Sequence, residues 1–323
     1  MRDRVRASVS GDAPGRRDDV NHVLMCCDAN YLQHAVVFLV SLLEHNPQRR
    51  FSVVLACDDL SPELKDRVDR TFRSYAGLQL RFSPVLGTAL EELPIHAGLT
   101  KEAWGRLWIE RYFPAEARKA FYFDPDIVVT GDLGGLLETD LADHLLAAVD
   151  IPGSVRATVH GYDPGDGYFN SGVLIVNLEK WRAGDRRGAL VAYTRAHPER
   201  VNDPDQDALN GCFHADRLRL DYIWNAITPF FWTDSGLELP ADEIERVRRD
   251  VRLVHFNGGS KPWLFMCNHP RKAEYLRFLR MTAWRDYRYP DRTPLNLVKK
   301  AAAWLVGERR IARIKQAIGL ARH

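Results

Sequence analysis

Short apolar runs alternate with amphipathic stretches along most of the chain. The runs are rich in aromatic and β-branched residues and lack a polar face, a pattern typical of strands that are buried on both sides. Strands are therefore predicted at residues 22–27, 51–57, 78–83, the first half of 121–129, 145–149, 167–178 and 251–254.

Helical periodicity separates several of these runs. After residue 30, apolar residues recur on one face as far as Asn46-Pro47, and Ser61-Pro62 begins a second helix with a good N-cap residue and a proline at the first helical position. A further helix is expected over residues 100–112, where Arg106 stands between two tryptophans. Strands and helices in alternation imply right-handed βαβ crossovers, an α/β fold and a mainly parallel sheet.

Polar residues stand directly after several of the predicted strands. In an open parallel sheet, ligands bind in the crevice beyond the carboxyl ends of the strands. We therefore expect polar residues that are distant in the sequence to meet along one edge of the sheet. These residues are Asp28, Asp124, Asp126, Asp150 and His255.

Asp124-Pro125-Asp126 is the sharpest candidate for metal chemistry. Residues i and i+2 of an extended chain point to the same side, ~6.5 Å apart along it, so the two carboxylates could flank one cation. Open carboxylate ligands suit Mg²⁺ or Mn²⁺ shared with a phosphate. The alternative is a surface turn, in which acidic residues and proline are common.

Each of the other polar candidates also has a local explanation. Asp28 or Asn30 could cap the helix that follows, and the acidic residues after Pro204 could cap another. His255 could be a core histidine that is satisfied by the backbone. What favours a shared site is that all of these residues occur together and in order along the chain.

Composition indicates a globular protein with one large core, since 46% of the 323 residues are hydrophobic. Five cysteines without paired zinc spacing argue against a disulfide framework and fit a reducing cytoplasm. No apolar stretch has the length of a membrane span, and the first twenty residues lack an apolar segment. Residues 1–19 are predicted to be a disordered lead, and secretion is not expected.

The basic charge is concentrated at the C-terminal end. Residues 291–323 carry eight Lys/Arg against two Asp/Glu, a net charge of +6, within a total of +2. Apolar residues recur there near helical spacing, so residues 286–323 are predicted to form a basic amphipathic tail that suits an anionic membrane surface. The alternative is a helix packed on the domain or a solvated end. No nucleic-acid partner is expected.

Four sequence blocks, in order, carry a resemblance to a known family. They are residues 27–31 (CDANY), 124–126 (DPD), 168–181 (beginning YFNSGV) and 255–263 (HFNGGSKPW), with DQDALN at 205–210 between the last two. Together they resemble the retaining glycosyltransferases of family 8, which include bacterial lipopolysaccharide galactosyl- and glucosyltransferases and glycogenin. The chain departs from the family pattern at Ala29, where an acidic residue is common, at Pro125, and at Leu264-Phe265.

The resemblance implies a fold and an activity. The fold would be a single GT-A-type, Rossmann-like nucleotide-sugar-binding domain over residues 20–285, with a mixed, mainly parallel sheet. The activity would be a retaining, Mn²⁺-dependent transfer of galactose or glucose from a UDP-hexose, with Mg²⁺ as the other candidate cation. The acceptor would be a glycan or a lipid-linked saccharide, in the synthesis of lipopolysaccharide or another bacterial surface polysaccharide. The location would be the cytoplasm or the inner membrane surface.

The resemblance also implies roles for individual residues. The metal would be held by Asp124, Asp126 and His255, and the catalytic candidates are Asp150, Asp205 and Gln206. Substrate would be bound by Asp28, Asn30, Tyr31, Arg106, Asn170, Ser171, Gly258 and Lys261. Two other functions stay open, a metal-dependent nucleotide-sugar hydrolase or nucleotidyltransferase, and a non-catalytic nucleotide-sugar-binding protein at a membrane surface.

Overall fold

The computed structural model describes residues 20–86, 101–233 and 235–306. Its strands are β1 Val20–Cys26, β2 Arg50–Ala56, β3 Leu78–Ser83, β4 Lys119–Phe123, β5 Ile127–Val129, β6 Leu146–Asp150, β7 Phe169–Asn177, β8 Arg217–Arg219, β9 Ala226–Ile227 and β10 Leu253–His255. Its α-helices are α1 Leu32–His45, α2 Pro62–Phe72, α3 Lys101–Gly105, α4 Gly134–Leu137, α5 Arg156–His160, α6 Leu178–Arg182, α7 Arg186–Ala196, α8 Pro204–Phe213, α9 Ala241–Asp250, α10 Lys272–Leu279 and α11 Pro294–Val306.

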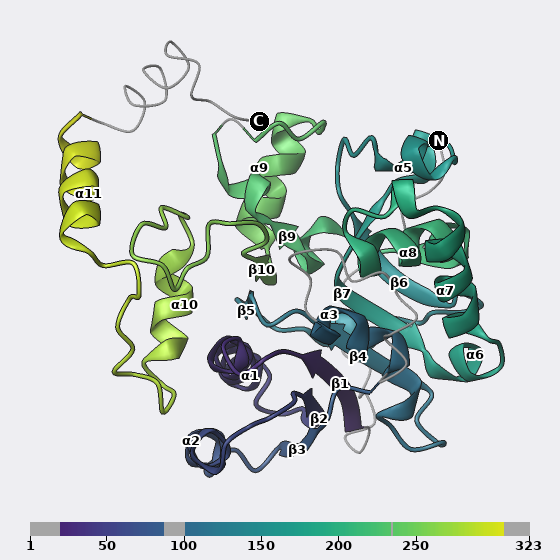
Figure 1. The fold of residues 1–323 in the computed structure, drawn as a ribbon, viewed down its shortest axis with the longest axis horizontal. Helices are drawn as coiled ribbons and strands as arrows, with labels where there is room; N and C mark the ends of the chain where they lie inside the picture. Colours follow the sequence, from purple (N-terminus) through teal and green to yellow (C-terminus); the bar gives the residue numbers. More distant parts are fainter. Residues whose placement is uncertain (1–19, 87–100, 234, 307–323) are drawn as a thin grey trace.

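A seven-stranded sheet forms the centre of the molecule, in the order β3-β2-β1-β4-β7-β6-β8 (Figure 1). The pairs β3/β2, β2/β1, β1/β4 and β6/β8 are parallel, whereas β7 runs antiparallel to both of its neighbours. The sheet is therefore mixed and mainly parallel, as the sequence predicts. Because β7 is reversed, its beginning lies at the edge where β4 and β6 end.

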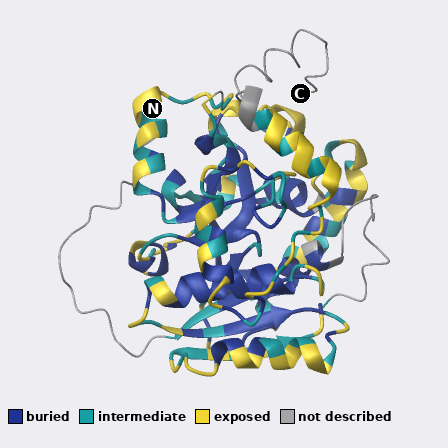
Figure 2. Ribbon diagram, turned by 90° about the vertical axis from the view of Figure 1, so that its left-hand side faces the viewer, coloured by how far each residue is buried: buried dark blue, intermediate teal, exposed yellow. Residues whose placement is uncertain are grey.

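The strands of this sheet are covered on both faces. Along β1, Val23 and Met25 belong to a core shared with α1, α10 and the loops around β9, whereas Leu24 and Cys26 pack with α6, α8 and the 101–113 segment. Alternate side chains of an extended strand point to opposite faces, so both faces are apolar and the strand reads as a continuous hydrophobic run. Figure 2 shows this buried layer in the middle, with exposed residues on the outer sides of the helices.

Two expectations from the sequence need correction. First, β10 does not join the large sheet; it pairs antiparallel with β5 and parallel with β9 in a separate three-stranded sheet. Second, residues 106–111 form a 3₁₀ helix after α3, and Trp108 has non-helical dihedral angles, so the chain is kinked there. At the start of α8 an acidic residue after Pro204 does have the expected capping role, because Asp207 accepts from the backbone N–H groups of Asn202 and Asp203, while Asp203 makes no side-chain cap.

The C-terminal helix α11 stands apart from the layered body (Figure 1). Lys300 of this helix lies over the Phe265 ring, 4.6 Å from its centroid, while Leu295 and Val298 are 62% and 66% exposed. The predicted lead at residues 1–19 and the end of the tail at 307–323 lie outside the described residues. The division of the chain at residue 285 stays a prediction. Within the described ranges, no helix combines the length and apolar character needed to span a membrane, and all five cysteines are free.

Candidate active site

The candidate residues meet where β4 ends and β7 begins. The backbone N–H of Asp124, directly after β4, donates to the carbonyl oxygen of Gly172 at 2.8 Å. Pro125 follows, which has no N–H to continue the ladder, and the chain turns into β5 of the small sheet. Since β5 pairs with β10, His255 at the end of β10 is brought back to the turn, opposite Ile127.

Asp124, Asp126 and His255 form a cluster whose ligand atoms lie within 4.8 Å of one another. His255 Nε2 is 3.2 Å from Asp126 Oδ1 and 3.8 Å from Asp124 Oδ2. The other oxygen of each carboxylate has its own partners, since Asp124 Oδ1 accepts from Tyr122 Oη at 2.9 Å and Asp126 Oδ2 accepts from Lys261 Nζ. Two carboxylates and an imidazole whose ligand atoms lie this close together fit a divalent cation.

The charges in this cluster are fixed by mutual attraction. Burial would raise the pKa of Asp126, but His255 and Lys261 hold it well below its usual range. Burial would likewise lower the pKa of Lys261, but the attraction of Asp126 outweighs it and raises that pKa. Lys261 is therefore an ammonium ion next to a carboxylate at neutral pH, and its Nζ also donates to the carbonyl oxygen of Phe256 at 3.0 Å.

Arg106 lies behind the cluster and joins it to helix α8. Its Nη2 is 3.0 Å from Asp124 Oδ1, and its Nη1 is 3.2 Å from Asp205 Oδ2 and 2.9 Å from the carbonyl oxygen of Ser171. The guanidinium also lies over the Tyr122 ring, 4.2 Å from the centroid. Arg106, which is predicted to bind substrate, is thus engaged by carboxylates, by the Ser171 hydroxyl and by the backbone of β7.

Asn170, Ser171, Asp205 and Gln206 come together as a buried polar group. Asn170 Nδ2 donates to Gln206 Oε1 at 2.9 Å, and Ser171 Oγ donates to Asp205 Oδ2 at 3.0 Å. Burial raises the pKa of Asp205, against the opposing effect of Arg106. The four residues come from two segments, the start of β7 and the first turn of α8. The order of these segments along the chain is evident from the sequence, but their contact is not.

Asp150 ends β6 beside Phe169 of β7, one residue from Asn170. Its carboxylate is engaged by two arginines, because Arg217 Nη2 donates to Oδ1 and Arg219 Nε lies 3.5 Å from Oδ2. Asp150 is therefore at the expected edge of the sheet, but its charge is balanced by protein groups.

Three of the residues predicted to bind substrate, Asp28, Asn30 and Tyr31, occupy the loop between β1 and α1. Asp28 Oδ1 accepts from the backbone N–H of Tyr31 at 2.8 Å, and Asn30 Nδ2 donates to Asp28 Oδ2 at 3.0 Å. The local capping role of Asp28 is thus present. The Tyr31 ring meets the edge of Trp263, with centroids 5.5 Å apart, which brings this loop close to the 255–263 segment. Within that segment Gly258 has φ of +77°, a conformation that favours glycine.

Two site residues were not among the predicted site residues, although Gly172 stands in the block that begins YFNSGV. Gly172 lies where an added Cβ would be 2.6 Å from Asp124 Oδ2 and closer still to His255 Cε1, so the cluster requires glycine at this position. Asn225 is 1% exposed, and its Oδ1 is 2.9 Å from His255 Nδ1. It stands in no strand or helix pattern, and only the three-dimensional fold brings it to the histidine.

Comparison with known proteins matches the part of the chain that contains these site residues. Residues 22–267 match the family model described as glycosyl transferase family 8. Over 278 residues the chain is 30% identical to General stress protein A of Bacillus subtilis, covering 83% of this chain and 96% of that protein. Over 267 residues it is 27% identical to a Lipopolysaccharide 1,3-galactosyltransferase of Salmonella typhimurium, covering 80% of this chain and 77% of that protein. The fold is similar to that of the galactosyltransferase LgtC, solved with donor and acceptor sugar analogues, with a TM-score of 0.71 at 23% identity over 82% of this chain and 99% of that chain.

Proposed function

The chain belongs to glycosyltransferase family 8, and from this we propose that it transfers a hexose, galactose or glucose, from a UDP-sugar to a saccharide acceptor. Its mixed α/β sheet is the GT-A fold that the sequence predicts. The observation that carries the proposal is the cluster of Asp124, Asp126 and His255 with Lys261 beside it. A divalent cation held by these three side chains, together with the Lys261 ammonium, would place positive charge where a leaving nucleoside diphosphate develops negative charge.

The proposed cation would be held by Asp124, Asp126 and His255. When bound there, Mn²⁺ or Mg²⁺ would act as a Lewis acid that stabilises the charge developing on the departing UDP. Lys261 contributes a fixed ammonium group next to the same point, on a segment that follows Gly258 and Gly259. Asp28, Asn30 and Tyr31 would bind the uridine end, because their loop approaches that segment through Trp263.

The donor hexose would lie against the start of β7 and the first turn of α8. Asn170, Ser171 and Gln206 are the polar groups there. The Arg106 guanidinium lies between Asp205 and Asp124 and orients both carboxylates. Asp150, at the end of β6, would contact the donor hexose from beside Asn170, and Arg217 would balance its charge.

We favour a front-face route to retention of the anomeric configuration. Gln206 Oε1 already accepts hydrogen bonds from Asn170 Nδ2 and the backbone N–H of Ser171, and an amide is a poor nucleophile. The Asp205 carboxylate is engaged by Arg106 and Ser171. In the front-face route the bond from the sugar C1 to the phosphate oxygen breaks while the acceptor hydroxyl oxygen bonds to C1 on the same face. The departing phosphate takes the hydroxyl proton.

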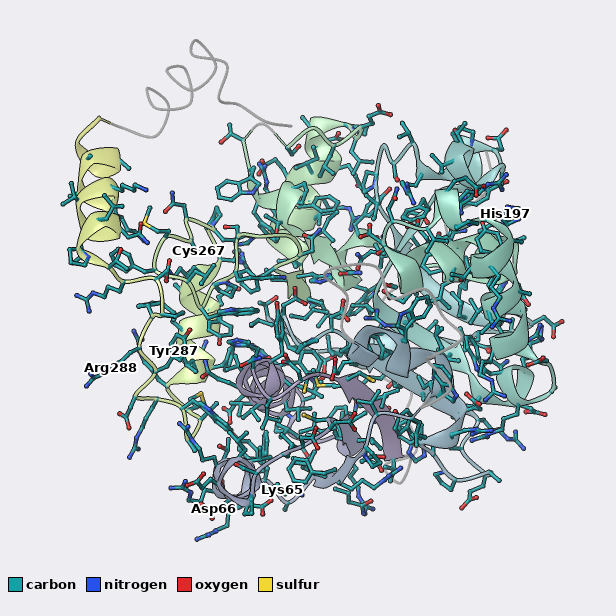
Figure 3. All side chains as sticks on the ribbon, viewed as in Figure 1. Lys65, Asp66, His197, Cys267, Tyr287 and Arg288 are labelled. Carbon is teal, nitrogen blue, oxygen red and sulfur yellow. The ribbon has the colours of Figure 1, made fainter. Side chains whose placement is uncertain are left out.

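The acceptor would be a glycan or lipid-linked saccharide in the synthesis of lipopolysaccharide or another bacterial surface polysaccharide. The match to a Lipopolysaccharide 1,3-galactosyltransferase supports this class. We place the enzyme in the cytoplasm, with α11 as a peripheral contact to anionic lipid of the inner membrane. Exposed Leu295, Leu297 and Val298 beside lysines support that contact, and Arg288 lies at the same periphery (Figure 3). A chain ending at Tyr289 should lose binding to anionic liposomes; equal pelleting of the two chains would contradict the contact.

The donor proposal is tested by thermal unfolding with Mn²⁺ and a panel of UDP-, GDP- and CDP-sugars. A ligand at ~100 times its Kd stabilises the folded protein by about 2.7 kcal/mol, so we expect a Mn²⁺-dependent shift confined to UDP-hexoses. Asp126→Asn should abolish the shift, whereas the control Asp66→Asn on α2, far from the cluster (Figure 3), should keep it. An equal shift with GDP-sugars, or one independent of Mn²⁺, would overturn the proposal. Release of free hexose at the same rate with and without acceptors would indicate a hydrolase.

A further inference from the structure

Asn225 joins the proposed metal ligand His255 to the proposed sugar-binding residue Asn170. Its Oδ1 lies 2.9 Å from His255 Nδ1, and its Nδ2 donates to Asn170 Oδ1 at 2.8 Å. All three side chains are buried. The two ends of one amide group therefore bind two residues that belong to different halves of the site.

Two backbone N–H groups fix the direction of these hydrogen bonds. Gly172 N donates to Asn170 Oδ1 at 3.0 Å, and Ser171 N donates to Gln206 Oε1 at 3.1 Å. A backbone N–H can only donate, so the amide oxygens of Asn170 and Gln206 must face β7. The atom of Asn225 that faces Asn170 Oδ1 must then be its NH₂ group. Its oxygen is left for His255.

The orientation of Asn225 decides which nitrogen of His255 carries the proton. An amide oxygen only accepts, so the hydrogen bond requires a proton on Nδ1. In the neutral form that binds a metal, the lone pair of the imidazole would then be on Nε2, the atom that faces Asp126 and Asp124 at 3.2 Å and 3.8 Å. This is the tautomer that a metal bound to Nε2 requires.

The same direction continues beyond Gln206 into the protein. Gln206 Nε2 donates to Tyr168 Oη at 3.1 Å, and Tyr168 Oη donates to Asp207 Oδ1 at 2.6 Å. Burial would raise the pKa of Asp207, but hydrogen bonds from His160, Arg156 and Tyr168 hold it well below its usual range. Asp207 is therefore a carboxylate that only accepts. The amide chain, defined as His255, Asn225, Asn170, Gln206, Tyr168 and Asp207, has every donor pointing away from the histidine.

The backbone holds Asn225 at the junction of the two sheets. It follows the 3₁₀ turn Tyr222–Trp224, where its N–H donates to the carbonyl oxygen of Tyr222 at 3.2 Å, and it immediately precedes β9. Because β9 pairs in parallel with β10, Ala226 and Ile227 lie opposite Val254 and His255. The side chain can thus reach from the small sheet to Asn170 on β7 of the large sheet.

We propose that Asn225 is a positioning residue that sets the tautomer of His255 and the orientation of Asn170 at the same time. The inference rests on the proposed metal and donor sites and adds the group that couples them. Hydrogen-bond partners of a metal-bound histidine fix its ring and raise its basicity, and their loss typically costs 10–100-fold in metal affinity or activity.

The first test is the Kd for Mn²⁺ alone, measured from the electron paramagnetic resonance signal of free Mn²⁺. Asn225→Ala should raise the Kd by about 10–100-fold. Asn46→Ala is the matched control, since Asn46 is also buried but bonds to Leu42 and Leu133 away from the cluster; it should lower stability and leave the Kd unchanged. A Kd for Asn225→Ala within twofold of the wild type would overturn the inference. If the wild type itself binds no Mn²⁺, that result contradicts the proposed metal site and, with it, this inference.

Asn225→Asp separates the hydrogen bond to His255 from the hydrogen bond to Asn170. Because aspartate is nearly the same size as asparagine, this variant also provides a test if Asn225→Ala fails to fold. A carboxylate still accepts from His255 Nδ1 but cannot donate to Asn170 Oδ1. We expect a Kd for Mn²⁺ within about threefold of the wild type, and about tenfold weaker binding of a UDP-hexose, with UDP itself changed less. Equal weakening of UDP and UDP-hexose, or loss of Mn²⁺ affinity as large as in Asn225→Ala, would contradict the proposal.

The tautomer can be read in the wild type without any substitution in the amide chain. In ¹⁵N-histidine-labelled protein with saturating Mg²⁺, which is diamagnetic, the His255 signals should report a proton on Nδ1. The signals are assigned by their loss in His255→Gln. A proton on Nε2 instead would overturn the inference.

Discussion

Arg106 and Asp205 form a buried ion pair in which Nη1 lies 3.2 Å from Oδ2, with side-chain exposures of 7% and 9%. The same guanidinium reaches Asp124 through Nη2 at 3.0 Å. The Arg106 guanidinium thus lies between two carboxylates, Asp124 in the proposed metal cluster and Asp205 in helix α8. Its presence explains how an acidic group can be buried directly behind a cluster that is itself acidic.

Replacing Arg106 should therefore lower the stability of the folded protein as well as its activity. In Arg106→Met the Asp205 carboxylate is left buried without its partner, which typically costs about 3–5 kcal/mol. Urea unfolding of the variant measures this loss. The double variant Arg106→Met/Asp205→Asn removes the unpaired charge and should recover part of it. A single variant within about 1 kcal/mol of the wild type would show that the pair is not a structural requirement.

Gly172→Ala should separate the metal ligands. The new Cβ would lie 2.6 Å from Asp124 Oδ2 and closer to His255 Cε1, and the His255 side chain is almost fully buried. Overpacking of this kind costs about 1–3 kcal/mol, and we expect the Kd for Mn²⁺ to rise more than about tenfold. Gly259→Ala is the control, because an added Cβ there has no atom within 4 Å. Normal Mn²⁺ binding by Gly172→Ala would contradict the assignment of Asp124 and His255 as joint ligands.

The elements with strong local patterns were predictable from the sequence. The Asp124 and Asp126 carboxylates do lie close together, although Pro125 and Asp126 form a turn between β4 and β5 and not the extended segment expected from the sequence. Ser61 caps α2 by accepting from Leu64 N, as the Ser-Pro pair predicts. The strand runs were found within a few residues because their apolar character needs no long-range information.

What the sequence could not supply is the direction and pairing of strands. A run of apolar residues is the same whether a strand is parallel or antiparallel, so the reversal of β7 that brings Asn170 to the site had no local signal. The same holds for β10, which carries His255 in a second sheet. Asn225 depends on both of these arrangements. Its contacts span 30 and 55 positions in the sequence, and no local pattern encodes such an approach.

Lys261 should contribute to binding of the diphosphate and not of the nucleoside. Its ammonium lies beside Asp126, on the segment that approaches the nucleotide loop. Charge-assisted hydrogen bonds to phosphate are worth about 1.5–3 kcal/mol, so Lys261→Met should raise the Kd for UDP with Mn²⁺ by about 10–100-fold. Calorimetric titration with uridine should show little change. Equal weakening of uridine and UDP would show that the lysine acts through the loop, and Lys65→Met on α2 provides the surface control (Figure 3).

His34 should make the protein less stable in mild acid. Its ring stacks on Trp263 at 3.5 Å, and its Nδ1 lies 2.6 Å from Tyr275 Oη. Burial lowers the pKa of His34 to about 3, whereas a histidine in an unfolded chain has a pKa of about 6.5. Between these values the unfolded chain binds a proton that the folded protein does not, so the free energy of unfolding falls as the pH falls.

The size of this effect can be isolated with one substitution. From pH 8 to pH 5 the His34 contribution is about 2 kcal/mol, at 1.36 kcal/mol per pKa unit. His34→Phe keeps an aromatic ring against Trp263 but cannot bind a proton. Urea unfolding between pH 8 and pH 5 should therefore show a shallower decline for the variant, while the two proteins run parallel above pH 7.5. If both proteins lose stability equally on acidification, the pKa of His34 is the same in the folded and the unfolded protein, and burial would not have lowered it.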